Sequence, residues 1–275
     1  MITKKIISKF NFHIAREAAH YYIKAGFWRG HRIHSPFVYH IIRHIITTRH
    51  RTDYVAAQRG LLYRSALLHS NQILSITDLG TGATKAPKQR SVKSIARNAA
   101  ITEKYGLMLY RLVEELKPHR ILELGTSLGI STQYMAQALT PDAHLSTIEG
   151  SSESALIASE QLQKFGYAVD LRIGNFDDLL PQILAEKELP NFFFIDGNHT
   201  CEATLRYFNQ IAEKTAHLPD ITTIVFDDIH WSAGMTEAWQ TIVADPRVST
   251  SIDLFRVGIV FFRKGCQKEF YRVRW

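Results

Sequence analysis

The sequence predicts an α/β protein, in which a doubly wound, mostly parallel sheet of seven strands ends in an antiparallel hairpin and follows an N-terminal helical extension. Two observations support this prediction. From residue 120 onward, short β-rich runs alternate with helical stretches, which is typical of a parallel sheet with helices on both faces. Near the end of the chain, the runs SIDLFRV and IVFFRK are joined tightly at Gly258, which indicates a terminal antiparallel pair.

The extension shows the apolar spacing of helices over residues 10–70. Between Phe37 and Ile46 the apolar residues recur at helical intervals. Ser35 can cap this helix, and Pro36 can occupy its first turn, where a missing N–H costs nothing. The front of the chain is therefore expected to be a helical module.

Two segments mark the change from extension to core. The tract 81–93 contains glycine, proline and several basic residues but no apolar periodicity, so it is predicted to be a loop. A helix over 103–117 is expected to end before Pro118, because the residue that precedes a proline is disfavoured in helical geometry. We therefore expect a basic helical extension over 1–99 and a core domain over 100–275.

Each element of the core can be assigned from its own pattern. The β-rich runs lie at 121–124, 144–148, 169–173, 191–195 and 222–226. The helical stretches lie near 131–140, 153–165, 177–187, 201–216 and 233–244. With the two runs of the tail, the strands number seven, and the first five are expected to be parallel.

The composition is that of an ordinary globular protein, with 45% hydrophobic and 21% charged residues. No window approaches the roughly 18 apolar residues that a membrane-spanning helix needs. The start, MITKKIISKF, has too short an apolar run for a signal peptide, so a cytoplasmic location is expected. The two cysteines, Cys201 and Cys266, support neither a disulfide framework nor a zinc site.

The charge is distributed unevenly along the chain. Residues 1–120 carry 21 Lys and Arg against 6 Asp and Glu, whereas residues 121–275 carry 12 against 20. A basic surface can attract phosphates, anionic substrates, nucleic acid or a membrane surface, or it can be a solvated face that pairs with the acidic half. Both interpretations stay open at this point.

Two stretches have the form of an apolar strand followed by an acid and a glycine-bearing turn: ITDLGTG at 76–82 and ILELGTS at 121–127. In doubly wound folds the ligand lies at the carboxyl ends of the strands, and a carboxylate at the end of the second strand binds the ribose hydroxyls. Only the second stretch has this context. A helix follows it directly, and the next strand ends in Glu149-Gly150, 20 residues after Gly129.

The first stretch is followed instead by the basic loop, so Asp78 and Gly80 are interpreted as a turn between extension and core. The alternative is that the basic loop closes over the ligand as a lid. The second stretch reads E-x-G-x-x-x-G from Glu123 to Gly129. A dinucleotide pyrophosphate favours G-x-G-x-x-G, and an acid at the strand end would repel it. This loop therefore suits a cationic ligand better.

On these residues the sequence resembles the class I S-adenosylmethionine-dependent methyltransferases, in particular the catechol and caffeoyl-CoA type O-methyltransferases and their uncharacterised bacterial relatives. The resemblance covers roughly 100–263 and implies a Rossmann-like, S-adenosylmethionine-binding domain over 100–275. It implies that Glu123 lies near the methionine amino end, that Glu149 holds the ribose, and that the turn after the third strand flanks the adenine. The cofactor residues implied are Glu123, Gly125, Thr126, Ser127, Gly129, Ser131, Glu149, Gly150, Gly174, Asn175, Phe176 and Asp196.

Three carboxylates follow the fourth and fifth strands: Asp196, Asp227 and Asp228. The carboxyl ends of adjacent parallel strands share one crevice, and clustered carboxylates suit Mg²⁺, Mn²⁺ or Ca²⁺. The resembled family places a divalent metal at such a trio, although its third ligand is often asparagine where this chain has Asp228. The alternative is that one of these acids caps the following helix.

His199, three residues after Asp196, stands where the catechol-type enzymes carry a lysine base. Imidazole titrates near neutrality and can accept a proton from a phenol or an alcohol. The hypothesis is that the metal binds the acceptor oxygen, that His199 removes its proton, and that the oxygen attacks the sulfonium methyl group in line. His230 is a second candidate base. Trp231 and Trp239 are candidates for the wall of an aromatic acceptor pocket, although a histidine or tryptophan is more often structural.

The leading hypothesis is thus a metal-dependent O-methyltransferase of a small hydroxylated acceptor, with the helical extension forming part of the acceptor pocket. Two alternatives stay open: a methyltransferase acting on nucleic acid or another polyanion, and a non-catalytic cofactor-binding module. The expected partners are a small-molecule methyl acceptor, an anionic partner for the basic front and a second copy of the chain in a homodimer.

Overall fold

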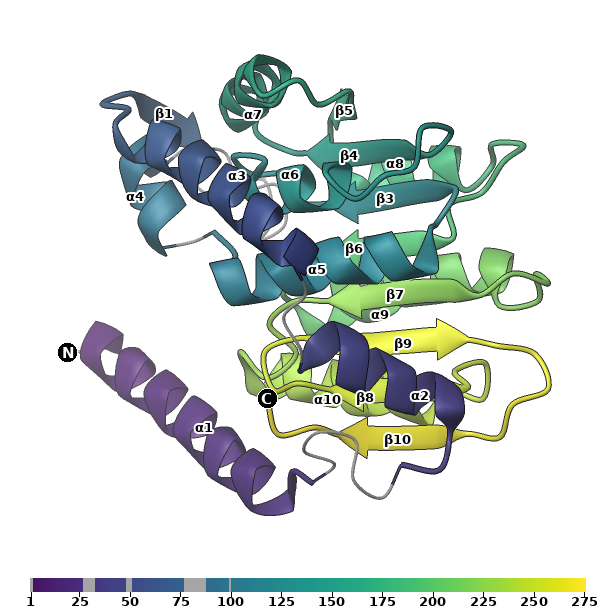
Figure 1. The fold of residues 1–275 in the computed structure, drawn as a ribbon. Coiled ribbons are helices and arrows are strands. Elements are labelled where there is room, and N and C mark those ends of the chain that lie inside the picture. Colours follow the sequence, from purple (N-terminus) through teal and green to yellow (C-terminus); the bar gives the residue numbers. More distant parts are fainter. Residues whose placement is uncertain (1, 27–32, 48–50, 77–87, 99) are drawn as a thin grey trace. The chain divides into compact units, whose positions relative to one another are not determined.

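The computed structural model describes the whole chain except residues 1, 27–32, 48–50, 77–87 and 99, which Figure 1 draws in grey. The chain divides into two compact units. Unit 1 comprises residues 1–43 and 194–275, and unit 2 comprises residues 44–193. The main sheet has eight strands among the described residues, in the order β10-β8-β9-β7-β6-β3-β4-β5.

Unit 2 contains a parallel part of the sheet and the helices that cover it. Its strands are β1 (Ile73–Ile76), β2 (Lys88–Ser91), β3 (Arg120–Leu124), β4 (His144–Glu149) and β5 (Asp170–Ile173), and β6 (Phe192–Ile195) begins in it. Its helices are α3 (Arg51–Leu68), α4 (Val92–Asn98), α5 (Glu103–Leu116), α6 (Ile130–Ala136), α7 (Ser152–Lys164) and α8 (Phe176–Ile183). β4 pairs in parallel with β3 and with β5.

Unit 1 joins the start of the chain to its end. Its helices are α1 (Ile2–Lys24), α2 (Pro36–His40), α9 (Cys201–Thr215) and α10 (Ala233–Ala244), and the π-helix η2 (Ile41–Ile46), which continues α2, begins in it. Its strands are β7 (Thr222–Phe226), β8 (Thr250–Asp253), β9 (Gly258–Phe262) and β10 (Glu269–Arg272). β9 lies antiparallel to β7 and to β8, and α2 packs on it where Phe37 meets Phe261 edge-on, with 5.1 Å between ring centroids.

The α/β prediction is confirmed, including the terminal antiparallel pair β8–β9. The sheet has one strand more than the sequence pattern predicted. β10 follows that pair and lies parallel to β8 at the edge of the sheet. Its segment, EFYR, is too short and too polar for a strand to be predicted from it. Backbone pairing with β8 holds this strand in place.

Local signals placed two helix ends correctly. The Ser35 side chain accepts a hydrogen bond from the Val38 N–H at 3.5 Å, and Pro36 occupies the first turn. α5 ends at Leu116, and Lys117 adopts the left-handed conformation (φ 46°) just before Pro118. The proline therefore terminates this helix as expected.

The predicted loop over 81–93 is wrong in its second half. Residues 88–91 form β2, which pairs antiparallel with β1, and α4 begins at Val92. This hairpin has little apolar periodicity because part of it faces solvent: Ile73 of β1 is 63% exposed. Its strands are specified by their mutual hydrogen bonds rather than by burial. Residues 77–87, with Asp78 and Gly80 of the first acid-glycine stretch, lie outside the described residues.

The helices of the described part include none that is both long and apolar enough to cross a bilayer. The division into an extension over 1–99 and a cofactor domain over 100–275 stays a prediction, since residues 44–99 belong to the same compact unit as the glycine loop.

Candidate functional site

The glycine loop between β3 and α6 has the backbone geometry of a ligand cradle. Gly125, Ser127 and Gly129 all have positive φ, at 108°, 49° and 75°. The N–H groups of Gly125 and Thr126 donate to the carbonyl of Ile148 at 3.0 and 3.3 Å. These bonds fold the loop over the end of β4, and Ser127 at its tip is exposed.

Gly129 is required by a close neighbour as well as by its φ. A Cβ at this position would lie 2.5 Å from the hydroxyl oxygen of Tyr63 on α3. That hydroxyl donates to the carbonyl of Leu128 at 3.0 Å. Burial raises the pKa of Tyr63, so the hydroxyl stays protonated and remains a donor. Tyr63 therefore supports the loop through contacts with Leu128 and Gly129. Nothing in the sequence spacing indicated this role.

Glu149, at the end of β4, is fixed against this loop. One carboxylate oxygen accepts from the Ser127 N–H at 2.7 Å, and the other accepts from the Ser151 N–H at 2.8 Å. Burial raises the pKa of Glu149, and these backbone donors together with the Gly150 N–H oppose that effect. Each oxygen retains a lone pair, so the oriented carboxylate can accept a pair of neighbouring hydroxyls.

Glu123 has a different environment although it also ends a strand. It is fully buried, and its carboxylate accepts from the hydroxyls of Ser131, Thr132 and Thr147 at 2.5, 2.5 and 2.7 Å. Burial raises its pKa, and the three hydroxyl donors lower it. Glu123 thus links β3, α6 and β4 beneath the loop. The expected contacts of Glu123 and Ser131 with a cofactor stay predictions.

The turn after β5 lies next to Glu149. The Gly174 N–H donates to the Glu149 carbonyl at 3.0 Å. Asn175 caps α8 by accepting from the Asp177 N–H at 3.1 Å, which places Phe176 in the first turn of that helix. The structure therefore brings together the glycine loop, Glu149-Gly150 and Gly174-Asn175-Phe176, all within unit 2.

The predicted acids are gathered in unit 1, around a residue that the sequence did not single out. Asp196 follows β6, and Asp227-Asp228 follow β7. Arg256 reaches them from the turn between β8 and β9: its Nε and Nη2 donate to the two carboxylate oxygens of Asp227 at 3.0 and 2.8 Å. Its Nε also lies 3.4 Å from Oδ1 of Asp228.

The charges of this cluster compensate one another. Burial would lower the pKa of Arg256, but the hydrogen bonds and charge of Asp227 and the charges of Asp228 and Asp196 raise it. Burial and the Asp227 charge raise the pKa of Asp228, while Arg256 and His199 lower it. His199 Nε2 lies 3.6 Å from Oδ1 of Asp196, so the predicted base and its neighbouring acid form a pair.

The carboxylates do not fit a divalent cation as they stand. Both oxygens of Asp227 accept from one guanidinium, and a cation bound to their remaining lone pairs would lie close to the positive charge of that guanidinium. Among the residues that the structure describes, no three His, Cys, Asp or Glu side chains could hold a metal ion together. As placed, Asp227 and Asp228 form an ion-pair cluster with Arg256.

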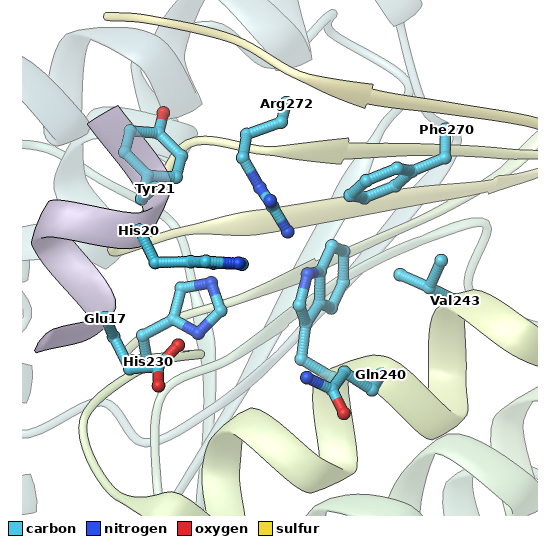
Figure 2. Close-up of a pocket in the computed structure, with 9 residues that line it drawn as sticks. Glu17, His20, Tyr21, His230, Gln240, Val243, Phe270 and Arg272 are labelled. Carbon is cyan, nitrogen blue, oxygen red and sulfur yellow. The ribbon is translucent and has the colours of Figure 1, made fainter. Parts of the chain in front are cut away.

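A cavity of about 190 Å³ opens elsewhere in unit 1, between α1, α10 and β10 (Figure 2). It is lined by Glu17, His20, Tyr21, His230, Trp239, Gln240, Val243, Phe270 and Arg272. Figure 2 shows His20 and Arg272 on one side of this space and Phe270 and Val243 on another. The cavity therefore combines an apolar wall with groups that can form hydrogen bonds.

His230, the second candidate base, has both ring nitrogens engaged. Nδ1 lies 3.2 Å from the Thr236 hydroxyl, and Nε2 lies 3.2 Å from Oδ2 of Asp253. The Arg272 Nε donates to the same Asp253 oxygen at 3.1 Å. These contacts indicate a structural role. Of the two tryptophans, Trp239 is buried and lines the cavity, whereas Trp231 is 47% exposed.

Similarity to known proteins is found in both sequence and fold. Residues 122–229 match a family model described as a methyltransferase domain. The chain is 34% identical over 127 residues to a transmembrane O-methyltransferase homolog of Rattus norvegicus. The aligned segment covers 45% of this chain and 49% of that protein. This chain is 33% identical over 102 residues to a catechol O-methyltransferase of Niastella koreensis. That alignment covers 36% of this chain and 46% of the Niastella protein.

Among solved structures, an O-methyltransferase from Bacillus cereus in complex with SAH aligns with a TM-score of 0.55 at 21% identity, over 83% of this chain and 97% of that chain. At this identity the likeness concerns the fold. The chain spans about half the length of the curated relatives it matches.

Proposed function

We propose that this chain, which carries a methyltransferase domain over residues 122–229, transfers the methyl group of S-adenosylmethionine to the hydroxyl oxygen of a small acceptor. The observation that carries the proposal is the geometry of Glu149. Its carboxylate is oriented by two backbone N–H groups, that of Ser127 in the glycine loop and that of Ser151 after β4, as a site for a ribose diol requires.

The cofactor site would be formed in unit 2. The loop from Gly125 to Gly129 would receive the methionine end of the ligand, because its backbone can approach a ligand closely without side chains in the way. Glu149 would accept hydrogen bonds from the two ribose hydroxyls, and Gly174-Asn175-Phe176 would flank the adenine. The absence of a basic residue in the loop agrees with a sulfonium ligand.

The acceptor would bind in the cavity of unit 1. Its volume, about 190 Å³, suits a small molecule of roughly one ring, since binding sites for drug-sized ligands start at about 300 Å³. Trp239 and Phe270 would contact an aromatic body, and Glu17 or His20 would bind its polar groups. α1 provides three residues of the lining, which supports the hypothesis that the helical extension contributes to the acceptor pocket.

The transfer would use His199 as the proton acceptor, oriented by Asp196 at 3.6 Å. The acceptor hydroxyl gives its proton to the imidazole, and the oxygen forms a bond to the methyl carbon while the carbon–sulfur bond breaks. The sulfonium leaves as the neutral thioether S-adenosylhomocysteine. The imidazolium then returns its proton to water.

The first test is calorimetric titration with S-adenosylmethionine and S-adenosylhomocysteine. We expect saturable one-to-one binding and a higher melting temperature with either compound. The second is incubation with a panel of small phenols and alcohols, followed by mass spectrometry for products that gain one CH₂. If neither adenosyl compound binds or protects the folded chain, the proposal fails.

A further inference from the structure

We infer that Arg256 takes the position of a divalent cation at the acid cluster formed by Asp196, Asp227 and Asp228, so that this cluster works without a metal. The inference builds on the proposed function, because it names the cationic group that serves the acceptor side of that reaction. It differs from the sequence hypothesis, in which the same three acids bind a metal.

The contact between Arg256 and Asp227 is a fork of two parallel hydrogen bonds, at 3.0 and 2.8 Å. Such a fork uses both carboxylate oxygens at once and adds geometric specificity to a charge-assisted pair. The Asp227 side chain is only 1% exposed, so this contact is shielded from water. The nearby Asp228 shares the same guanidinium at 3.4 Å.

The backbone around Arg256 holds the guanidinium in place. Phe255 has φ 70°, and its N–H donates to Oδ1 of Asp253 at 2.9 Å. The Arg256 carbonyl accepts from the Ile229 N–H at 3.0 Å, directly after the acid pair. Phe255 in turn stacks on His230, with 5.6 Å between ring centroids. Contacts of Phe255 and Arg256 thus hold the turn in place, and they position Arg256 at the acid cluster.

The local charge also opposes a metal. The titratable groups that face one another here are Asp196 and His199 after β6, Asp227 and Asp228 after β7, and Arg256 from the β8–β9 turn. Mg²⁺ binds carboxylate oxygens at about 2.0–2.1 Å. An ion at that distance from Asp227 would lie close to the guanidinium and would be repelled by its charge.

In the proposed reaction, the fixed positive charge would stabilise the oxyanion that develops as the acceptor loses its proton. A preorganised cation in a site shielded from water is an established way to lower such a barrier. The guanidinium remains charged at any working pH, so this contribution needs no added ion.

The test is a titration with Mn²⁺ of the wild type, Arg256→Met and Arg256→Lys. Electron paramagnetic resonance and calorimetry measure the binding. We expect no saturable Mn²⁺ site at the cluster in the wild type or in Arg256→Lys, which keeps the charge. Arg256→Met frees Asp227 and Asp228 and should gain a saturable site, which Asp227→Asn in the same background should remove.

The matched control is Arg247→Met. Arg247 forms a similar fork with Asp245, at 2.9 and 2.7 Å, but outside the acid cluster, so its loss should create no Mn²⁺ site. Saturable Mn²⁺ binding by the wild type that Asp227→Asn abolishes would overturn the inference, and so would a folded Arg256→Met that gains nothing. If Arg256→Met does not fold, the wild-type titration and Arg256→Lys still decide.

Metal binding is measured without turnover, so this result is separate from the proposed function. Failure to bind S-adenosylmethionine would refute the proposed function and leave the Mn²⁺ result standing. Once a substrate is found, turnover should be unchanged by a chelator in the wild type.

Discussion

At the scale of single residues, two carboxylates with the same place in the sequence pattern have different surroundings. Glu123 and Glu149 each stand at the end of a parallel strand. The first is fully buried and accepts from three hydroxyls. The second is held by two backbone N–H groups of the glycine loop and its neighbour. Glu123 is therefore fixed inside the protein beneath the loop, whereas Glu149 is oriented at its surface, where the proposed function has it bind the ligand.

The Glu149 role predicts a specific loss of affinity. Glu149→Gln should weaken S-adenosylhomocysteine binding by about 1–3 kcal/mol, because the charge-assisted bonds to the ribose are lost. Calorimetric titration measures this change. Glu160→Gln, an exposed position on α7, is the matched control and should bind as the wild type does. Equal affinities for Glu149→Gln and wild type would show that the ligand does not use this carboxylate.

Asp253 predicts a pH-dependent stability. Burial raises its pKa, but the hydrogen bond and charge of His230, the Phe255 N–H and the Arg272 charge outweigh burial and lower the pKa below the ordinary 3.8. A lowered carboxyl pKa contributes stability that is complete above the unfolded value and is lost as pH falls through the folded value. Asp253→Asn should therefore cost about 3 kcal/mol at pH 7.

The cost of Asp253→Asn should shrink as the pH falls below the ordinary Asp value of 3.8. Guanidinium chloride unfolding at a series of pH values measures the difference between variant and wild type. Asp220→Asn, on an exposed turn, should change little at any pH. A difference that stays constant down to acid would mean that the Asp253 charge does not stabilise the fold.

At the scale of elements, the glycine loop depends on α3. Gly129→Ala should destabilise the protein for two reasons: its φ of 75° is strained for alanine, and its Cβ would meet the Tyr63 hydroxyl at 2.5 Å. Gly166, with φ 77° and no atom near its Cβ position, isolates the first reason. We expect about 1 kcal/mol for Gly166→Ala and roughly 1–3 kcal/mol more for Gly129→Ala.

Thermal unfolding measures both variants. A Tyr63→Phe background removes the clashing hydroxyl, so a double-mutant cycle should show part of the Gly129→Ala cost recovered. Equal losses for Gly129→Ala and Gly166→Ala would mean that Tyr63 moves aside freely and does not support the loop.

Most elements from residue 120 onward could be predicted because each is specified by its own sequence. The apolar runs that became β3, β6 and β7 are buried along their length, and buried strands have a clear pattern. The hairpin β1–β2 and the edge strand β10 could not be predicted, because their pairing rather than their composition specifies them. The local sequence pattern of a strand does not indicate which distant segment it pairs with.

The candidate site divides in the same way. Glu149 could be proposed from spacing alone, since the order of loop, helix, strand and acid repeats in doubly wound folds. Arg256 could not, because it stands 28 residues after Asp228 and meets the acids through the turn between β8 and β9. The acids suggested a divalent metal, and their residue types could not show that a guanidinium of the same chain binds Asp227 and lies close to Asp228.

At the scale of the whole molecule, the front of the chain serves both units. Residues 1–43 belong to unit 1, where Tyr21 on α1 is buried and lines the cavity. Residues 44–99 belong to unit 2, where Tyr63 on α3 supports the glycine loop. The two parts of the extension should therefore have different functions.

Two deletions separate these functions. Removal of residues 1–26 takes away α1 and one wall of the cavity, but leaves unit 2 intact, so S-adenosylhomocysteine affinity should stay within about a factor of two while acceptor turnover is lost. Removal of residues 1–99 also takes away α3 and Tyr63, so affinity should fall by more than about tenfold. Calorimetry and product mass spectrometry measure the two effects, and circular dichroism checks folding.

His20→Ala is the milder counterpart of the shorter deletion, because His20 lines the cavity from an exposed position and its loss should leave the fold unchanged. It should reduce turnover without changing cofactor affinity. Loss of cofactor binding in the 1–26 deletion, with its fold retained, would instead make α1 part of the cofactor site. Full affinity after removal of residues 1–99 would show that the glycine loop holds its shape without α3, because Tyr63 would then be dispensable for the cradle.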